Sequence, residues 1–385
     1  MLDCQREAFQ LPADVHYLNG AYMSPLLRRV EEAGIEGMRR KRNPSTITPA
    51  DFFEDSASVR TLFADLIKAK DASRVAIIPS ASYGLSTVAR NIPLQRGQTV
   101  LMSAGQMPSN VYCWRRVAEE AGAQMRVVEP PAPGEGSFTE ALEAAIDDRT
   151  AVVALGTVHW TDGRGIDAEL LADRARAVGA HLVLDGTQSI GVMPFDVERV
   201  RPTAVVSASY KWLLGPYSIG VAWYGPVLDG GVPLEETWLS RPGSDDFSRL
   251  ADYRDDYREG ATRYDVGETA NFILLPMLRA ALEQLSEWTV EAIAAYCRRL
   301  TDRVANEATR LGYGVPDADE RAPHIIGLRL DPAQGEALRS ALERRHIQVA
   351  IRGEAVRVST YLYNDDRDIA ALTDALEEAA GVSSR

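Results

Sequence analysis

The sequence has few cysteines and no long apolar run, and each absence limits what the protein can be. Its 385 residues include three cysteines, Cys4, Cys113 and Cys297, which lie far apart in the chain. An odd and widely spaced set predicts neither a disulfide framework nor a zinc site. No stretch approaches the roughly 20 apolar residues of a membrane span, and the N-terminus lacks a charged-then-apolar leader. We therefore expect a reduced, cytoplasmic protein with no membrane association and no bound metal.

The sequence also lacks an excess of positive charge. Lys and Arg number 42 against 55 Asp and Glu, which gives a net charge of −13 at pH 7. This balance argues against nucleic acid as the main partner, while a local basic pocket for a phosphate or carboxylate stays open. The hydrophobic fraction of 45% is typical of a globular protein, and the length predicts a large domain with a smaller companion.

Apolar, strand-like runs alternate with helical patterns over much of the chain. Seven such runs lie at 75–78, 99–102, 125–128, 150–155, 181–184, 204–206 and 219–223. Helical patterns, such as those at 110–121, 138–146 and 167–178, separate most of them. This alternation predicts an α/β fold with a seven-stranded, mostly parallel sheet covered on both faces, and ligands at the carboxyl ends of its strands. The last run follows its neighbour without a helix, which leaves an antiparallel direction open for it.

The ends of the chain predict smaller units. A short strand and a turn are expected within residues 16–25, ahead of a helix that begins near Leu26. A long helical run with one or two breaks is expected at 275–311. A small α/β unit follows, with strands at 325–330, 348–351 and 356–360 and helices at 335–345 and from about residue 366. We therefore predict an N-terminal segment (1–25) at the domain junction, a large domain (26–275) and a small C-terminal domain (276–385).

A polar, poorly periodic stretch at 241–258 interrupts this pattern. It predicts a long loop. The sequence leaves three roles open for it: an active-site lid, a subunit contact or a solvated connection.

Two charged residues follow neighbouring apolar runs. Lys211 comes shortly after the run at 204–206, and an ammonium there must be paired, neutral or covalently used, unless it simply reaches solvent as most such lysines do. Asp185 directly follows the run at 181–184 and also needs a partner, which a protonated ring nitrogen could supply. One helix and one strand separate the two residues, so both should lie at the same edge of neighbouring strands.

A possible anion site follows the run at 75–78. The small residues from Ser80 to Ser82 stand before a helix, where free backbone N–H groups can bind a phosphate. Ser82 is expected to cap this helix whether or not a phosphate binds. A phosphate cradle, an acid and a buried lysine at one sheet edge are the set that a pyridoxal phosphate site requires.

Three motifs occur in order along the chain: Asp185 to Gln188, Ser209 to Lys211 with Gly215-Pro216, and Arg357 to Asn364. Together they resemble the class V aminotransferase family of pyridoxal phosphate enzymes, and the resemblance extends from about residue 17 to residue 369. The family includes cysteine desulfurases, selenocysteine lyases, kynureninase and isopenicillin N epimerase-like proteins. The resemblance implies the fold of type I pyridoxal phosphate-dependent transferases, an amino-acid substrate and a homodimer.

The resemblance assigns roles around the cofactor ring. Lys211 would form the Schiff base and carry the substrate Cα proton. Asp185 would bind the pyridine nitrogen, and Gln188 would bind the phenolic oxygen. Met107 would pack against the ring, in the place of an aromatic residue or a histidine.

It also assigns roles around the phosphate. Ala81 and Ser82 would hold the phosphate, and Tyr210 would add its phenol. Thr269 and Asn271 match, loosely, a loop that reaches the phosphate of the neighbouring subunit.

Four further residues are expected at the substrate. Arg357 would clamp the α-carboxylate in a bidentate pair, with a surface ion pair as the alternative. Asn19 is expected beside the substrate. His159 and Trp160 either contact the substrate or the cofactor, or serve only for packing.

The departures from the family decide which reaction is expected. Cysteine desulfurases carry a nucleophilic cysteine shortly before the arginine strand, whereas the segment 349–357 has none, and their histidine before the lysine is Tyr210 here. We therefore expect a β-eliminating C–S lyase, with an aminotransferase or an amino-acid epimerase as alternatives. A kynureninase-type hydrolase and a cysteine desulfurase are less favoured. A non-catalytic regulator that binds pyridoxal phosphate is the alternative from another class, but no DNA-binding segment or lost lysine supports it.

Overall fold

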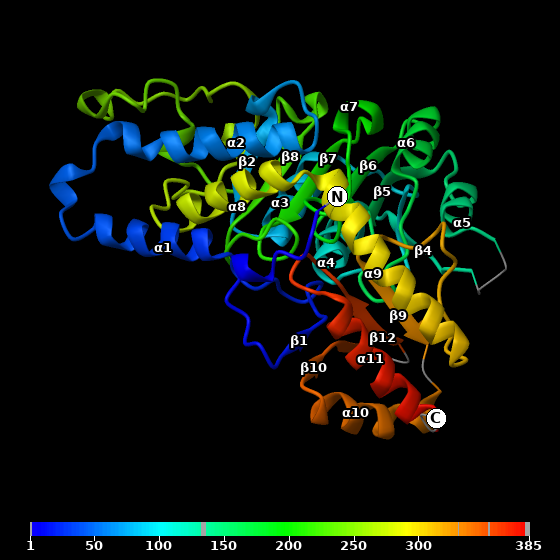
Figure 1. Ribbon diagram of the computed structural model, residues 1–385. Helices are drawn as coiled ribbons and strands as arrows, with labels where there is room; N and C mark the ends of the chain where they lie inside the picture. The colour runs from blue at the N-terminus through cyan, green and yellow to red at the C-terminus, as the bar shows by residue number, and fades with distance from the viewer. Residues whose placement is uncertain (1, 132–135, 330, 353–354, 382–385) are drawn as a thin grey trace.

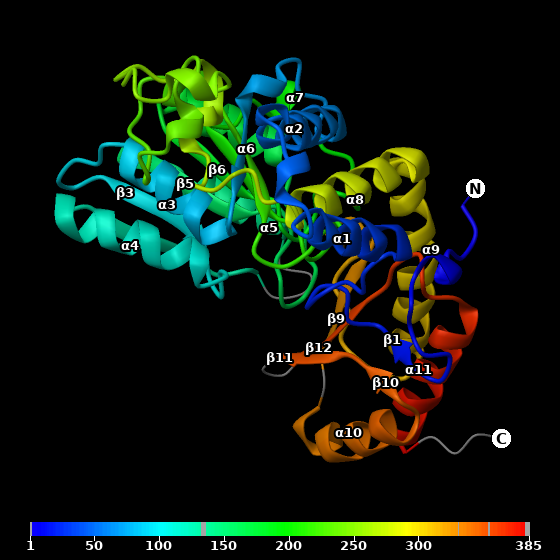
Figure 2. The ribbon, with the colours of Figure 1, turned by 90° about the vertical axis from the view of Figure 1, so that its left-hand side faces the viewer.

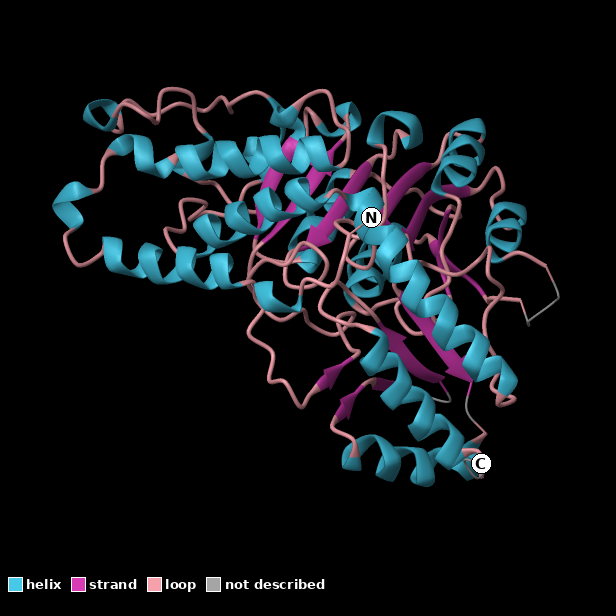
Figure 3. Ribbon diagram, viewed as in Figure 1, coloured by secondary structure: helices cyan, strands magenta, loops and turns pink. Residues whose placement is uncertain are grey.

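The computed structural model of the chain describes residues 2–131, 136–329, 331–352 and 355–381. Helices lie on both sides of the strands (Figure 3). The α-helices are α1 (Arg28–Arg40), α2 (Glu54–Leu66), α3 (Ala81–Asn91), α4 (Ser109–Ala121), α5 (Phe138–Ala144), α6 (Ala168–Ala177), α7 (Val197–Val200), α8 (Leu274–Trp288), α9 (Val290–Arg310), α10 (Gly335–Arg344) and α11 (Asp366–Ala379). The strands are β1 (His16–Tyr17), β2 (Val75–Ile78), β3 (Thr99–Ser103), β4 (Gln124–Val128), β5 (Thr150–Gly156), β6 (His181–Asp185), β7 (Ala204–Ala208), β8 (Gly220–Tyr224), β9 (Ile325–Arg329), β10 (Ile347–Gln348), β11 (Ala350–Arg352) and β12 (Ala355–Ser359).

Seven strands form the central sheet in the order β2-β8-β7-β6-β5-β3-β4. Strand β8 is antiparallel to both β2 and β7. The remaining pairs are parallel. The expected seven-stranded, mostly parallel sheet is confirmed. The last run, whose direction the sequence left open, forms β8 and is antiparallel to both of its neighbours.

Successive side chains of a strand point to opposite sides of the sheet, and helices bury both sides. On one face, Val206 belongs to the buried cluster that contains Leu85 of α3 and Trp114 of α4. On the other face, Val205 packs in the cluster that contains Phe63 of α2 and residues of α5, α6 and α8. This double burial explains why the strands are continuous apolar runs in the sequence.

The C-terminal elements form a second layer below the central sheet in Figure 1. Strands β11, β12 and β9 make an antiparallel sheet, and α9 runs from beside the central sheet toward it (Figures 1 and 2). The two helices and the strands expected at 325–330 and 356–360 are present, although Leu330 lies outside the described residues. The single strand expected at 348–351 is wrong, because this segment is divided between β10, which pairs with β1, and β11, which pairs with β12. The long helical run breaks once, at Thr289, between α8 and α9. The boundary expected between residues 275 and 276 falls inside α8, and the domain division stays a prediction.

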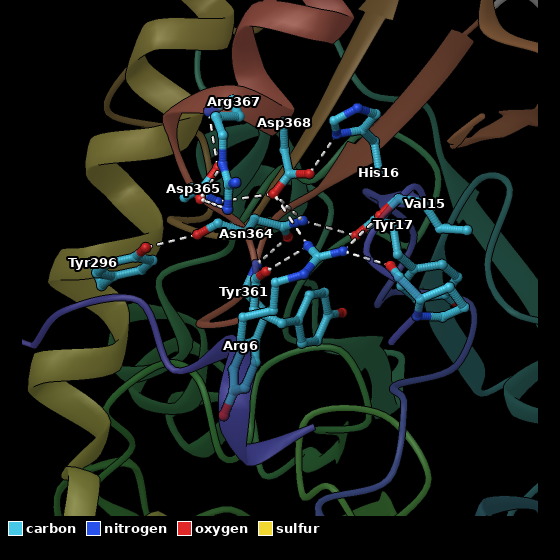
Figure 4. Close-up of polar contacts among 12 residues, drawn as sticks. Arg6, Val15, His16, Tyr17, Tyr296, Tyr361, Asn364, Asp365, Arg367 and Asp368 are labelled. Atoms are coloured by element: carbon cyan, nitrogen blue, oxygen red, sulfur yellow. Dashed lines mark hydrogen bonds and ion pairs between the residues drawn. The ribbon is translucent and has the colours of Figure 1, made fainter. Parts of the chain in front are cut away.

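The N-terminal segment is fixed against the C-terminal elements. Strand β1 pairs in parallel with β10. The carboxylate of Asp368 is buried, lies 2.7 Å from His16 Nδ1 and forms an ion pair with Arg6 at 3.8 Å (Figure 4). Asn364 Nδ2 donates to the carbonyl of Tyr17 at 2.9 Å. These contacts set the path of the chain into residues 19–21, which reach the edge of the central sheet.

Candidate active site

A cavity of about 250 Å³ lies where β2, β6 and β7 end. All three strands point the same way, because β2 and β7 are both antiparallel to β8 and β7 is parallel to β6. The cavity is thus at the carboxyl edge of the sheet, as expected. Eight of the expected site residues line it: Ala81, Ser82, Met107, Trp160, Asp185, Gln188, Tyr210 and Lys211.

Lys211 lies in a tight loop between β7 and β8. Its side chain is buried, and Nζ is 5.5 Å from the ring centroid of Tyr210. The loop is held from inside by Ser209, whose Oγ lies 2.7 Å from each of two loop carbonyl oxygens. Leu214 and Ser218 have φ angles of 56° and 67°, an unfavourable conformation for residues other than glycine. Backbone strain of this kind clusters at functional sites, where surrounding contacts maintain it.

Asp185 ends β6 and presents its carboxylate to the cavity. One oxygen, Oδ1, accepts a hydrogen bond from the backbone N–H of Thr187 at 3.0 Å. The residue is 7% exposed. A buried carboxylate is costly unless a positive charge lies near it, so this position suits a ligand with a protonated ring nitrogen.

The N-terminus of α3 forms another side of the cavity. Ser80, in extended conformation, is the N-cap, and its Oγ accepts from the N–H of Tyr83 at 3.2 Å. The expectation that Ser82 caps the helix is wrong, because the helix begins at Ala81 and Ser82 is its second residue. The Ser82 hydroxyl lies 2.9 Å from that of Ser80. The N–H groups of Ala81 and Ser82 have no acceptor among the described residues, so the helix end can bind an anion.

Arg357 lies beyond the cavity wall, on β12. It is 1% exposed; Nη1 donates to the carbonyl of Trp160 at 2.7 Å and Nη2 to Oδ1 of Asn19 at 3.4 Å. Three expected substrate residues therefore lie together, although only Trp160 lines the cavity. His159 does not line the cavity. Its ring is held by Asp162, whose Oδ1 lies 3.0 Å from Nδ1, and by the carbonyl of Ala104, which accepts from Nε2 at 3.1 Å. Its position favours the packing alternative.

Two of the expected phosphate residues lie outside the cavity. Thr269 Oγ1 donates to the carbonyl of Val266 at 2.6 Å. Asn271 Oδ1 accepts from the first backbone N–H groups at α8, at 2.9 and 3.1 Å. Their role was assigned to the neighbouring subunit, so it stays a prediction.

Ser80, the first residue of the expected anion site, also lines the cavity. So do five polar residues that the sequence did not single out: Gln106, Ser109, Thr187, Tyr217 and Ser218. Thr187 lies within the Asp185–Gln188 motif and could have been included on that ground. Tyr217 stands at the rim with its ring centroid 4.7 Å from that of Tyr210. Burial raises the pKa of Tyr210, so its phenol stays a proton donor.

The loop 241–258 does not line this cavity. Its residues instead border a separate surface depression beside Trp238. Within the described chain, no cluster of His, Cys, Asp and Glu has the makings of a metal site, and no helix is both long and apolar enough to cross a bilayer.

Comparisons with known proteins agree with this geometry. The isopenicillin N epimerase of Streptomyces clavuligerus is 27% identical over 323 residues, which cover 81% of each chain. The apo structure of a cysteine desulfurase from Thermococcus onnurineus NA1 superposes with a TM-score of 0.82 at 19% identity, over 99% of both chains. The cystine C–S lyase C-DES, in complex with cysteine persulfide, gives a TM-score of 0.83 at 17% identity, over 94% of this chain and 97% of that one. The model of the aminotransferase class-V family matches residues 48–372, and the chain belongs to this family of pyridoxal phosphate-dependent enzymes.

Proposed function

We propose that this enzyme is a C–S lyase, which eliminates a sulfur leaving group from the β-carbon of an α-amino acid. The observation that carries the proposal is a cavity that holds Lys211 and Asp185 but no cysteine. The three thiols lie elsewhere: Cys4 is exposed, Cys113 is half-buried on α4 and Cys297 is buried in α9.

The residues present fit pyridoxal phosphate. The N-terminus of α3 supplies N–H groups and the Ser80 and Ser82 hydroxyls for the phosphate. Asp185 supplies the charge that keeps a ring nitrogen protonated. Lys211 supplies the amine that would hold the cofactor covalently. When bound, the cofactor supplies an electron-withdrawing ring that stores the electron pair left at the substrate Cα.

The chain's own groups then perform the remaining work. The amine of Lys211 takes the proton from the substrate Cα. The Arg357 guanidinium, held by Asn19 and the Trp160 carbonyl, binds the α-carboxylate and orients the Cα–H bond toward the lysine. The Cβ–S bond breaks and the sulfur leaves as a thiol. For a cysteine conjugate, addition of water gives pyruvate and ammonia.

The absence of a thiol from the cavity separates elimination from desulfuration. Desulfuration by sulfur transfer needs a protein thiolate to attack the sulfur and carry it away. Burial raises the pKa of the Cys113 thiol to about 11, so it stays protonated at neutral pH. Elimination needs no such nucleophile, because the sulfur leaves with its own substituent.

Amino-acid epimerisation is the second candidate. It is favoured by the 27% identity with isopenicillin N epimerase over most of both chains. It uses the same lysine, acid and arginine, and it differs from elimination in returning the proton to Cα without loss of a group.

The homodimer is part of the same proposal. Thr269 and Asn271 would complete the phosphate site of the partner subunit. The three free thiols suit a reducing compartment such as the cytoplasm.

The test is an absorbance spectrum of the cofactor-loaded enzyme with a panel of amino acids that includes cysteine conjugates and their sulfoxides. The expected result is release of pyruvate with the original spectrum restored, together with a thiol from the conjugates and a sulfenic acid from the sulfoxides. Loss of optical activity without pyruvate would establish the epimerase instead. A lasting change to the pyridoxamine spectrum, reversed by a keto acid, would establish an aminotransferase.

A further inference from the structure

Three segments that are far apart in the sequence converge on Gln188. Its Nε2 donates to the carbonyl of Ala21, in the N-terminal segment, at 3.0 Å. Its Oε1 accepts from the indole N–H of Trp212, directly after Lys211, at 2.9 Å. Its backbone carbonyl accepts from Nε2 of His324, directly before β9, at 2.7 Å. Gln188 is 5% exposed and lines the cavity.

These partners determine which way the amide of Gln188 points. The indole nitrogen can only donate and the Ala21 carbonyl can only accept. If the amide were flipped, its NH₂ group would face the indole N–H of Trp212, donor against donor. Its oxygen would face the carbonyl of Ala21, acceptor against acceptor. With the observed orientation one N–H of Nε2 is used by Ala21, so a second N–H remains for an acceptor.

Trp212 has little freedom to adjust. Its ring is 0% exposed and makes an edge contact with His324, with the centroids 4.3 Å apart. A Cβ on Gly20 would approach the Trp212 ring to 3.1 Å. His324 is fully buried, and burial lowers its pKa to about 3, which keeps it neutral and its Nε2–H available as the donor to Gln188. The indole therefore holds a fixed direction for its N–H.

We propose that Trp212 is a positioning residue that orients the Gln188 amide so that an N–H, and not an oxygen, faces the phenolic oxygen of the cofactor. The inference rests on the proposed cofactor site and adds a residue that acts through Gln188. Because Trp212 follows the lysine directly, the same short loop places the lysine and orients the glutamine.

The test is a pH titration of the visible absorbance band of the enzyme loaded with pyridoxal phosphate. A hydrogen bond to a phenolate stabilises the deprotonated chromophore, so losing it raises the apparent pKa of the band. We expect Trp212→Phe, which keeps an aromatic ring against His324 and loses the N–H, to raise the apparent pKa of the band by roughly half a unit to one unit, the size of one oriented hydrogen bond. Gln188→Leu should raise it as well. The double variant should show no more than the Gln188→Leu shift, since both changes remove the same contact.

Two further proteins complete the experiment. Trp114→Phe is the matched control, because Trp114 is also 0% exposed and donates to an amide oxygen, Asn110 Oδ1, at 3.1 Å. It should titrate as the wild type does. If Trp212→Phe does not fold, 3-benzothienylalanine at position 212 keeps the fused-ring shape without the N–H and should give the same shift.

The inference is overturned if the proteins altered at position 212 titrate at the wild-type pH, or if the Trp212→Phe shift adds in full to that of Gln188→Leu. A failure of the proposed function looks different, because the wild-type protein would then show no visible band with pyridoxal phosphate.

Discussion

The buried His324 should make the protein sensitive to mild acid. An unfolded chain protonates this histidine below its ordinary pKa of 6.5, whereas burial lowers the folded-state pKa to about 3. Between these values the unfolded state binds one more proton, so stability falls as the pH falls. The contribution is present above pH 6.5 and is lost progressively toward pH 3. From pH 7 to pH 5, a group with these two pKa values costs about 2 kcal/mol of unfolding free energy.

The perturbation is His324→Gln, whose amide can still donate to the Gln188 carbonyl but does not titrate. Urea unfolding at pH 7 and pH 5, at fixed protein and cofactor concentrations, gives the loss for each protein. The wild type should lose about 2 kcal/mol more than the variant over this interval. His346→Asn is the control, since His346 is exposed and its positive φ of 53° suits asparagine. Equal losses in the wild type and in His324→Gln would refute the reasoning.

Three further outcomes are expected. Lys211→Ala should abolish both the visible cofactor band and turnover, as measured by absorbance and product release, because no other amine lines the cavity among the described residues. Arg357→Lys should lower kcat/KM by roughly ten- to a hundredfold, seen in steady-state kinetics, since a single ammonium cannot replace a bidentate fork. Gly163→Ala should lower the unfolding free energy by about 2–4 kcal/mol, because φ is +79° and the new Cβ would lie 2.3 Å from the Ile325 carbonyl. Gly179→Ala, with φ of +75° and open space around it, should cost only about 1 kcal/mol in the same urea titration.

The central sheet could be predicted because its strands are buried on both faces. Such strands must be apolar at every position, so each appears as an uninterrupted run, and the runs expected at 75–78 and 181–184 lie in β2 and β6. The partners of β8 could not be fixed, because a short connection permits more than one neighbour. The cap of α3 was misplaced because Ser80 and Ser82 are equally good N-cap residues, and only the extended backbone of Ser80 decides between them.

The cavity residues divide in the same way. Asp185 and Lys211 could be predicted, because Asp185 ends β6, Lys211 lies shortly after β7, and neighbouring parallel strands bring their ends together. The contact between His324 and Gln188 could not, because it joins residues 136 positions apart through the packing of the C-terminal elements. Trp212 shows the limit most clearly: a buried tryptophan beside the lysine is expected for packing alone, and only the direction of its N–H assigns it a partner.

The acid–base groups of the cavity bear on which reaction follows removal of the Cα proton. An epimerase that works with two bases needs one on each side of Cα. Besides Lys211 and Asp185, the ionisable side chains that line the cavity are Tyr210 and Tyr217. Tyr210 lies beside the lysine, with its ring 5.5 Å from Nζ, and burial raises its pKa, so it is a poor base at neutral pH. Elimination requires one base and a leaving group, and no thiol lies in the cavity to capture the sulfur. Lys211, in the loop after β7, would therefore suffice as the base for the proposed elimination, whereas two-base epimerisation would require Tyr217 at the rim to remove or return the second proton.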